Sequence, residues 1–199
     1  MASLKQMSQT ISLCMITKNE EKYLEQCLNS VKEIVDEIVI VDTGSTDKTK
    51  EIAKKFSSKI YDFKWIDDFS AARNESLRHA TKEWILAMDA DEAIEKKGLE
   101  KIKAAIENAG SGLVGFQLEQ RSYINNFFEG ALKNDSDFEL VNQYPFYIPH
   151  HLVRLFKNNL GLKFRHRVHE LIEDSRIEKK LKYQKLDVNL HHFGSLKDG

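Results

Sequence analysis

Apolar and polar residues form blocks along the first half of the chain, and the blocks have the lengths of strands and helices. Short apolar runs of β-forming residues predict strands that are buried on both faces, as in a parallel sheet. These strands are expected at residues 11–16, 37–41, 59–65 and 83–89. Between them, apolar residues recur at the three- to four-residue spacing of one helix face. These helices are expected at residues 19–32, 46–56 and 70–80, the last with Ser70 as its N-cap.

Strands that alternate with helices through short connections predict βαβ units and a parallel sheet. Residues 10–92 are therefore expected to form a doubly wound half-domain. Ligands in such sheets bind outside the carboxyl ends of the strands. Asp42 and Asp89 both lie at such ends.

The pattern changes after residue 95. A helix is predicted at residues 98–110, and strands at 113–124, 151–158 and 186–193. Between the first two of these strands, residues 125–150 hold both prolines and many aromatic side chains. This composition predicts a long loop, or a lid over a site.

Composition and charge exclude several classes of protein. Lys and Arg total 30 against 31 Asp and Glu, so the chain has no basic footprint for nucleic acid. The apolar positions of Cys14 and Cys27 indicate two buried thiols, which fit a reducing cytoplasm. No apolar run reaches the ~18 residues of a transmembrane helix, and residues 1–10 lack a secretory signal pattern. We expect a cytoplasmic protein, and leave open a peripheral place on the inner membrane face.

The strongest chemical signal is MDADEAI, at residues 88–94. Asp89 and Asp91 follow a predicted buried strand, and in an extended chain their side chains point to the same side. Two close carboxylates repel unless a cation lies between them, and hard oxygen ligands suit Mg²⁺ or Mn²⁺ with phosphates completing the coordination. The alternative is a polar turn with a helix cap, but the position after the fourth strand favours a metal site.

A second signal is VDTGSTD, at residues 41–47. Gly44 permits a turn, and Ser45 or Thr46 can cap the following helix. Neither task requires Asp42, which at the strand end can accept a hydrogen bond from a base N–H or a ribose hydroxyl. A strand-to-helix turn without a ligand is the alternative.

Two further stretches place polar side chains at the same edge. In MITKNEE, Thr17 and Glu20 follow the first strand, although Asn19 can also act there as a helix cap. In DDFSAARN, Arg73 lies in the first turns of a helix, where an arginine can reach a base or a phosphate. A solvated helix residue is the alternative for Arg73.

These stretches together carry a resemblance. The run ISLCMITKNEEKYLEQCLNSV, followed by EIVIVDTGSTDKTKEIA, DFSAARNESL and WILAMDADEAI, resembles a family 2 glycosyltransferase of the GT-A fold. It is similar to a bacterial subgroup with VDTGSTD and DADE motifs. The resemblance covers residues 11–94 and reappears more weakly in VRLFKN, RVHE and HHFG, whereas residues 125–150 have no counterpart.

The resemblance implies an α/β GT-A fold with a mostly parallel central sheet and helices on both faces. It implies one domain over residues 1–199, in which residues 10–95 bind the nucleotide and residues 96–199 form the acceptor side. The chain ends five residues after Gly194, which leaves open whether a further C-terminal domain is missing.

The resemblance also assigns roles to residues. Base and ribose contacts fall to Thr17, Glu20, Asp42 and Arg73. Asp91 is the implied direct ligand of the metal, Mn²⁺ or Mg²⁺. Asp89 is expected beside the ribose or a metal-bound water, and His192 is expected to close on the metal or the diphosphate. His191 and His192 face opposite ways in a strand, so only one of them should point at the site.

The implied reaction is an inverting transfer from a nucleotide-diphosphate sugar, usually UDP-linked, to an unknown acceptor. Inversion requires a base on the face opposite the leaving group, and no motif in the sequence identifies this base. Glu170 in RVHE is the best candidate, with His169 beside it, and a surface acid is the alternative. Arg154 and Arg167 are secondary candidates for diphosphate or acceptor contacts. The acceptor can be a glycan, a lipid-linked sugar, a peptide or a small molecule.

Two rival functions share parts of this pattern. A sugar nucleotidyltransferase would show a glycine-rich phosphate loop after the first strand, but that position reads TKNEE. A degenerate transferase-like module that binds a nucleotide or a partner without turnover is disfavoured by the intact Asp89 and Asp91 pair. The absence of an obvious base keeps this second alternative open.

Overall fold

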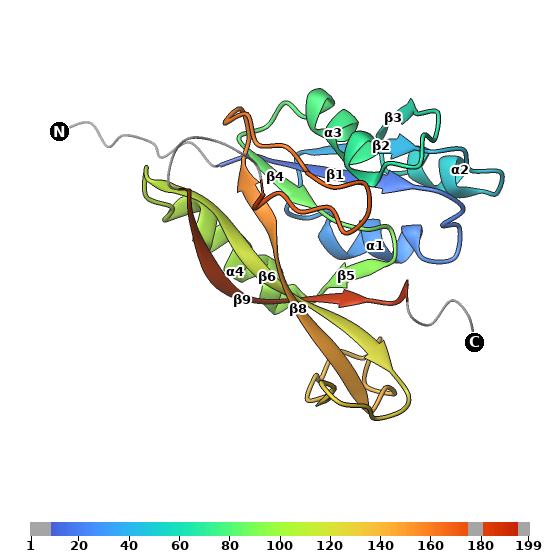
Figure 1. Ribbon diagram of the computed structural model, residues 1–199, viewed down its shortest axis with the longest axis vertical. Helices are drawn as coiled ribbons and strands as arrows, with labels where there is room; N and C mark the ends of the chain where they lie inside the picture. Colours follow the sequence, from blue (N-terminus) through green and yellow to red (C-terminus); the bar gives the residue numbers. More distant parts are fainter. Residues whose placement is uncertain (1–8, 175–180, 195–199) are drawn as a thin grey trace.

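A computed structural model of the protein describes residues 9–174 and 181–194 (Figure 1). Within them, a nine-stranded sheet has the order β3-β2-β1-β4-β8-β6-β9-β5, and β7 pairs with β8 beside this path. The strands are β1 (Ile11–Thr17), β2 (Glu37–Asp42), β3 (Lys59–Asp62), β4 (Trp84–Ala87), β5 (Glu92–Ile94), β6 (Leu113–Ile124), β7 (Leu132–Lys133), β8 (Phe146–Lys157) and β9 (Lys182–His192). The helices are α1 (Leu24–Val31), α2 (Thr49–Lys54), α3 (Phe69–His79) and α4 (Lys96–Glu107). In these stretches, no helix has the length and apolar character needed to cross a membrane.

The four strands of the first half form the predicted parallel sheet. β1 pairs in parallel with β2 and with β4, and β2 pairs in parallel with β3. Alternate residues of β1 belong to different cores: Leu13 and Met15 pack with α1, whereas Cys14 packs with the α3 residue Leu77 on the opposite face. The sheet therefore carries helices on both faces, as predicted.

Several element ends differ from the prediction. α1 begins at Leu24 rather than at residue 19, because Asn19 adopts a left-handed backbone with φ of 55° and cannot continue a helix. β3 ends at Asp62, so Trp65 lies in the loop that follows the strand. The N-cap of α3 is Asp68 and not Ser70, since Asp68 Oδ1 accepts from the Ala71 amide at 2.9 Å.

The second half adds strands mainly in antiparallel order. β8 pairs antiparallel with β4 and with β6, whereas β9 runs parallel to β6 and antiparallel to β5. β6 and β8 form a long ribbon that extends beyond the body of the molecule (Figure 1). Residues 125–145 form the predicted loop, interrupted by the short β7, whereas residues 146–150 belong to β8. The prediction of a lid over a site is wrong, because Phe138, Val141 and Tyr144 pack instead on a small core with Tyr123 and Phe193.

Glu37 bonds to neighbouring segments at the edge of the sheet where the parallel strands begin. Its buried carboxylate accepts from the Ser12 hydroxyl at 2.5 Å, Lys59 Nζ at 2.6 Å and the Thr81 amide at 2.8 Å. Burial would raise the pKa of Glu37, but these bonds outweigh it and lower the pKa to about 2.

We therefore expect Glu37→Ala to lower the free energy of unfolding by about 2–3 kcal/mol, because it removes the acceptor of the buried Ser12 hydroxyl and of two further donors. Glu33→Ala, on the exposed surface nearby, should change it by less than about 0.5 kcal/mol. Urea denaturation of both variants measures the difference. Equal stabilities would show that the Glu37 bonds contribute nothing.

Candidate functional site

A cavity of about 640 Å³ opens at the carboxyl ends of the parallel strands. Its lining contains seven of the eight side chains that the sequence assigned to a site: Thr17, Glu20, Arg73, Asp89, Asp91, Glu170 and His192. They come from the ends of β1 and β4, from α3, from the loop between β8 and β9, and from the end of β9. Segments far apart in the sequence thus supply one site.

Pairing of β5 with β9 brings Asp91 close to His192. In the antiparallel register Glu92 lies opposite His192, and the Phe193 amide donates to the Asp91 carbonyl at 2.9 Å. Asp91 Oδ2 then lies 3.7 Å from His192 Nε2. The extended chain predicted for residues 89–91 is wrong, since the Glu92 amide donates to the Asp89 carbonyl and closes a turn. Both aspartates reach the cavity from this turn.

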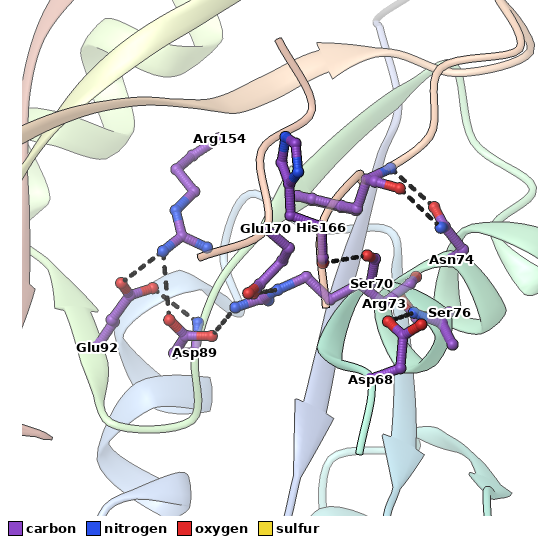
Figure 2. Close-up of polar contacts among 12 residues, drawn as sticks. Asp68, Ser70, Arg73, Asn74, Ser76, Asp89, Glu92, Arg154, His166 and Glu170 are labelled. Atoms are coloured by element: carbon purple, nitrogen blue, oxygen red, sulfur yellow. Dashed lines mark hydrogen bonds and ion pairs between the residues drawn. The ribbon is translucent and has the colours of Figure 1, made fainter. Parts of the chain in front are cut away.

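Two arginines hold Asp89 (Figure 2). Its Oδ1 accepts from Arg73 Nη2 at 2.5 Å, and its Oδ2 accepts from Arg154 Nη2 at 3.2 Å. Burial alone would raise the pKa of Asp89, but the charges of Arg73 and Arg154 outweigh it and hold that pKa below its usual range. Asp89 is therefore an anion whose two oxygens are both engaged by the protein.

Arg73 also links the loop between β8 and β9 to Asp89. Its Nε donates to Glu170 Oε1, while the same guanidinium bonds Asp89 (Figure 2). The loop has further attachments to α3: the Ser70 hydroxyl donates to the His166 carbonyl, and the Asn74 side chain bonds both backbone groups of Phe164. Arg73 is 5% exposed, so it bridges two carboxylates rather than standing as a solvated helix residue.

Glu92 and Arg154 lie behind Asp89 and form a layer that the sequence did not predict. The Glu92 carboxylate accepts from the Asp89 amide at 2.7 Å and from Arg154 Nη2 at 3.5 Å. Burial raises the pKa of Glu92 to about 8, although the charge of Arg154 opposes the rise. Arg154 also donates to Gln120 and is buried. Its prediction as a diphosphate or acceptor contact finds no support here, because it points at Asp89 and lies outside the cavity lining.

Asp42 is the predicted site residue that does not line the cavity. Its Oδ1 accepts from the amides of Gly44 and Ser45 at 3.1 and 2.9 Å, and its Oδ2 accepts from the Thr17 hydroxyl at 3.2 Å. Burial would raise the pKa of Asp42, but these bonds and the charge of Lys50 hold it below its usual range. The idea that the turn does not need Asp42 is therefore wrong. A nucleotide contact by Asp42 stays a prediction.

The histidines separate as the strand geometry requires. His192 lines the cavity, whereas His191 is fully buried against Tyr123 and Phe138. Burial lowers the pKa of His191 to about 4, so it stays neutral. His192 is accordingly the histidine that can serve a ligand.

A divalent ion fits this site with two protein ligands. Among the described residues, no three His, Cys, Asp or Glu side chains are gathered to hold a metal. Asp91 and His192 do face each other, and the backbone of Gly194 leaves the space beside them open: a methyl group there would lie 2.5 Å from His192 Nε2 and 2.8 Å from Asp91 Oδ2. Such a pair suits a metal that keeps water and phosphate oxygens as its other ligands.

Sequence reasoning missed the apolar part of the cavity. Trp65, Phe69 and Val168 all line it, and Phe69 and Val168 are exposed. The sequence showed Trp65 at the end of a predicted strand and Phe69 beside a predicted cap, so local pattern gave no reason to place them in a site. Arg167 lies outside the cavity lining and donates to the carbonyls of Ile66 and Asp67.

Comparison with known proteins identifies the family. The family model described as glycosyl transferase family 2 matches residues 12–192. The chain belongs to this family. Its arrangement of strands and helices is the GT-A class of α/β fold that the sequence predicted.

Two curated relatives extend over most of the chain. A TPR repeat-containing protein of Synechococcus elongatus is 35% identical over 165 residues, which cover 83% of this chain and 36% of the relative. The SPbeta prophage-derived glycosyltransferase SunS of Bacillus subtilis is 34% identical over 165 residues, which cover 81% and 34%. The chain thus spans about a third of the length of these relatives.

Solved structures also show similarity. S. aureus TarS, residues 1–349, matches with a TM-score of 0.49 and 26% identity over 64% of this chain and 42% of that one. Glucosyl-3-phosphoglycerate synthase of Mycobacterium tuberculosis, solved in complex with Mn²⁺, UDP and glucosyl-3-phosphoglycerate, matches with a TM-score of 0.49 and 21% identity over 57% and 44%.

Proposed function

We propose that this chain is an inverting glycosyltransferase domain that moves a sugar from a nucleotide-diphosphate donor, UDP-linked, to an acceptor. The observation that carries the proposal is the cavity at the strand ends, where Asp91 and His192 face each other beside the arginine-held Asp89. Membership of family 2 supports the same reaction class. In this proposal residues 10–95 bind the nucleotide and residues 96–199 form the acceptor side.

The donor would lie along the cavity. Thr17 and Glu20 contact base and ribose, and Asp42 supports them through the Thr17 hydroxyl. Asp91 and His192 would hold Mn²⁺ or Mg²⁺. When bound, such a metal would offset the negative charge that grows on the leaving diphosphate. Arg73 and Arg154 keep Asp89 ionised and oriented, and Asp89 would lie beside the ribose or a metal-bound water.

The bond changes are those of a single displacement. The acceptor nucleophile forms a bond to the anomeric carbon while the bond from that carbon to the diphosphate oxygen breaks, and the diphosphate leaves with the electron pair. The acceptor's proton passes to a base on the opposite face. Glu170 is the proposed base: it lines the cavity, and Arg73 occupies its Oε1, which leaves Oε2 to take the proton. His169 lines the cavity beside it and is the second candidate.

A thermal-shift screen of nucleotides and nucleotide sugars, with and without Mn²⁺, tests the proposal. A ligand of the folded state raises its stability by about 2.7 kcal/mol at 100 times its Kd, so we expect UDP and one UDP-sugar to raise the melting temperature, and to do so more with Mn²⁺. A donor-hydrolysis assay then follows turnover. If no nucleotide stabilises the protein, the proposal is wrong. Metal-dependent UDP binding without turnover of any donor would instead support the non-enzymatic module.

A further inference from the structure

Trp65 and Phe69 present an aromatic surface to one end of the cavity. Their rings meet edge to face, with centroids 4.8 Å apart and planes at 70°. The indole Nε1 already donates to Asp67 Oδ1 at 2.8 Å, so the polar atom of Trp65 is satisfied within its own loop. What the two side chains offer to the cavity is therefore ring surface, and Phe69 is 40% exposed.

This aromatic surface is held in place before any ligand arrives. The Phe69 amide donates to the Arg167 carbonyl at 3.0 Å, and Arg167 Nε donates back to the Asp67 carbonyl at 3.1 Å. Asp68 caps α3 directly before Phe69. A surface fixed in this way loses little conformational freedom when a ring packs on it.

The strand order separates the loop that carries Trp65 from the turn that carries the metal ligands along the edge of the sheet. Across the carboxyl edge the order is β3, β2, β1, β4, and neighbouring strands lie about 4.8 Å apart, so β3 and β4 are separated by roughly 14 Å. Trp65 follows β3, whereas Asp89 and Asp91 follow β4. Phe69 and Arg73, one helical turn apart on α3, connect the aromatic end to the charged end.

We propose that Trp65 and Phe69 stack on the nucleobase of the donor. A nucleoside diphosphate has a flat ring at one end and a metal-binding diphosphate at the other, which is the order of chemistry found along this cavity. Thr17, between the two ends, is then placed for the polar contacts of the nucleoside. The inference rests on the proposed function and adds a base-binding pair that the motifs did not indicate.

Calorimetric titration with uridine and with UDP plus Mn²⁺ tests this pair. Aromatic stacking on a base contributes enough that its removal should weaken binding by about fivefold to 100-fold. We expect Trp65→Ala and Phe69→Ala to weaken uridine and UDP by the same factor, because the ring contact is independent of the phosphates. Ile66→Ala is the matched control: Ile66 is 52% exposed beside Trp65 but lies outside the cavity lining, so its affinities should equal those of the unmutated chain.

Tryptophan fluorescence gives a second measurement that does not depend on alanine variants. The chain has two tryptophans, and Trp84 is buried in the core. Uridine should quench the emission of the unmutated chain, and Trp65→Phe, which keeps a ring at the site, should abolish the quenching while retaining measurable uridine binding.

The outcomes separate the stacking inference from the proposed function. UDP binding that Trp65→Ala and Phe69→Ala leave unchanged would overturn the stacking inference alone. A chain that binds neither uridine nor UDP would overturn the proposed function. If Trp65→Ala spares both nucleotides but weakens an alkyl glycoside such as octyl glucoside, the surface belongs to the acceptor, and the nucleobase assignment is wrong.

Discussion

Replacing Arg73 with alanine is expected to lower the free energy of unfolding by about 3–5 kcal/mol, the cost of removing one partner from a buried ion pair. Arg73 bonds Asp89 and Glu170 at once, and the three side chains are largely buried. Without the guanidinium, Asp89 keeps the longer contact to Arg154, and Glu170 loses its partner on α3. Urea denaturation of the folded chain measures the loss.

The same helix supplies a matched control. Arg78 is also an arginine of α3, but its side chain is 75% exposed and pairs only with Glu75 one turn away. Because exposed pairs contribute little, Arg78→Ala should cost less than about 1 kcal/mol. Arg73→Lys should fall between the two variants, since lysine keeps the charge but not the fork that reaches two carboxylates. If Arg73→Ala costs no more than Arg78→Ala, the bridge does not stabilise the fold.

The bridge also explains why Arg73→Ala should disturb the site. Glu170 lies 97 residues from Arg73 in the sequence, in the loop whose residues 168–170 line the cavity. The remaining attachments of this loop, through Ser70 and Asn74, hold its other positions. We therefore expect the variant to keep its fold at low denaturant while its UDP affinity falls, and calorimetry on the folded variant separates this effect from the stability loss.

Local pattern was sufficient for the strands and helices of the first half. Buried apolar runs and helix-face spacing depend on residues close in sequence, so β1, β2 and β4 lie where the sequence placed them. The ends were less predictable, because they depend on single contacts. Asp68, rather than Ser70, caps α3 because the Ser70 hydroxyl instead bonds the His166 carbonyl.

The sequence predicted those residues of the candidate site that belong to motifs at strand ends. The parallel sheet brings such residues to one edge, and seven of the eight assigned side chains line the cavity there. The partners of those residues were not predictable. Arg154 contacts Asp89 only because β8 pairs with β4, and nothing in the local sequence of either strand specifies that pairing. Trp65 and Phe69 were missed because neither belongs to a motif at a strand end.

Replacing Asp91 with alanine is expected to remove the effect of Mn²⁺ on UDP binding and to lower donor turnover by at least about 100-fold. A bound metal stabilises a developing negative charge by several kcal/mol, and about 1.4 kcal/mol corresponds to a factor of ten in rate. Calorimetry with UDP, with and without Mn²⁺, gives the first quantity, and donor hydrolysis gives the second. Asp91→Ala should bind UDP in Mn²⁺ as weakly as the unmutated chain does without metal.

Asp42→Ala provides the contrast, since it should weaken UDP binding equally with and without Mn²⁺ by loosening Thr17 and the turn at residues 42–45. Gly194→Ala leaves every ligand atom in place but inserts a methyl group 2.8 Å from Asp91 Oδ2 and 2.5 Å from His192 Nε2. One of the two side chains must then move, so this variant should lose the Mn²⁺ effect as Asp91→Ala does. If Mn²⁺ still strengthens UDP binding in both Asp91→Ala and Gly194→Ala, the metal binds elsewhere. If the Mn²⁺ effect is lost in both, the metal needs the geometry of the Asp91 and His192 pair and not only its charge.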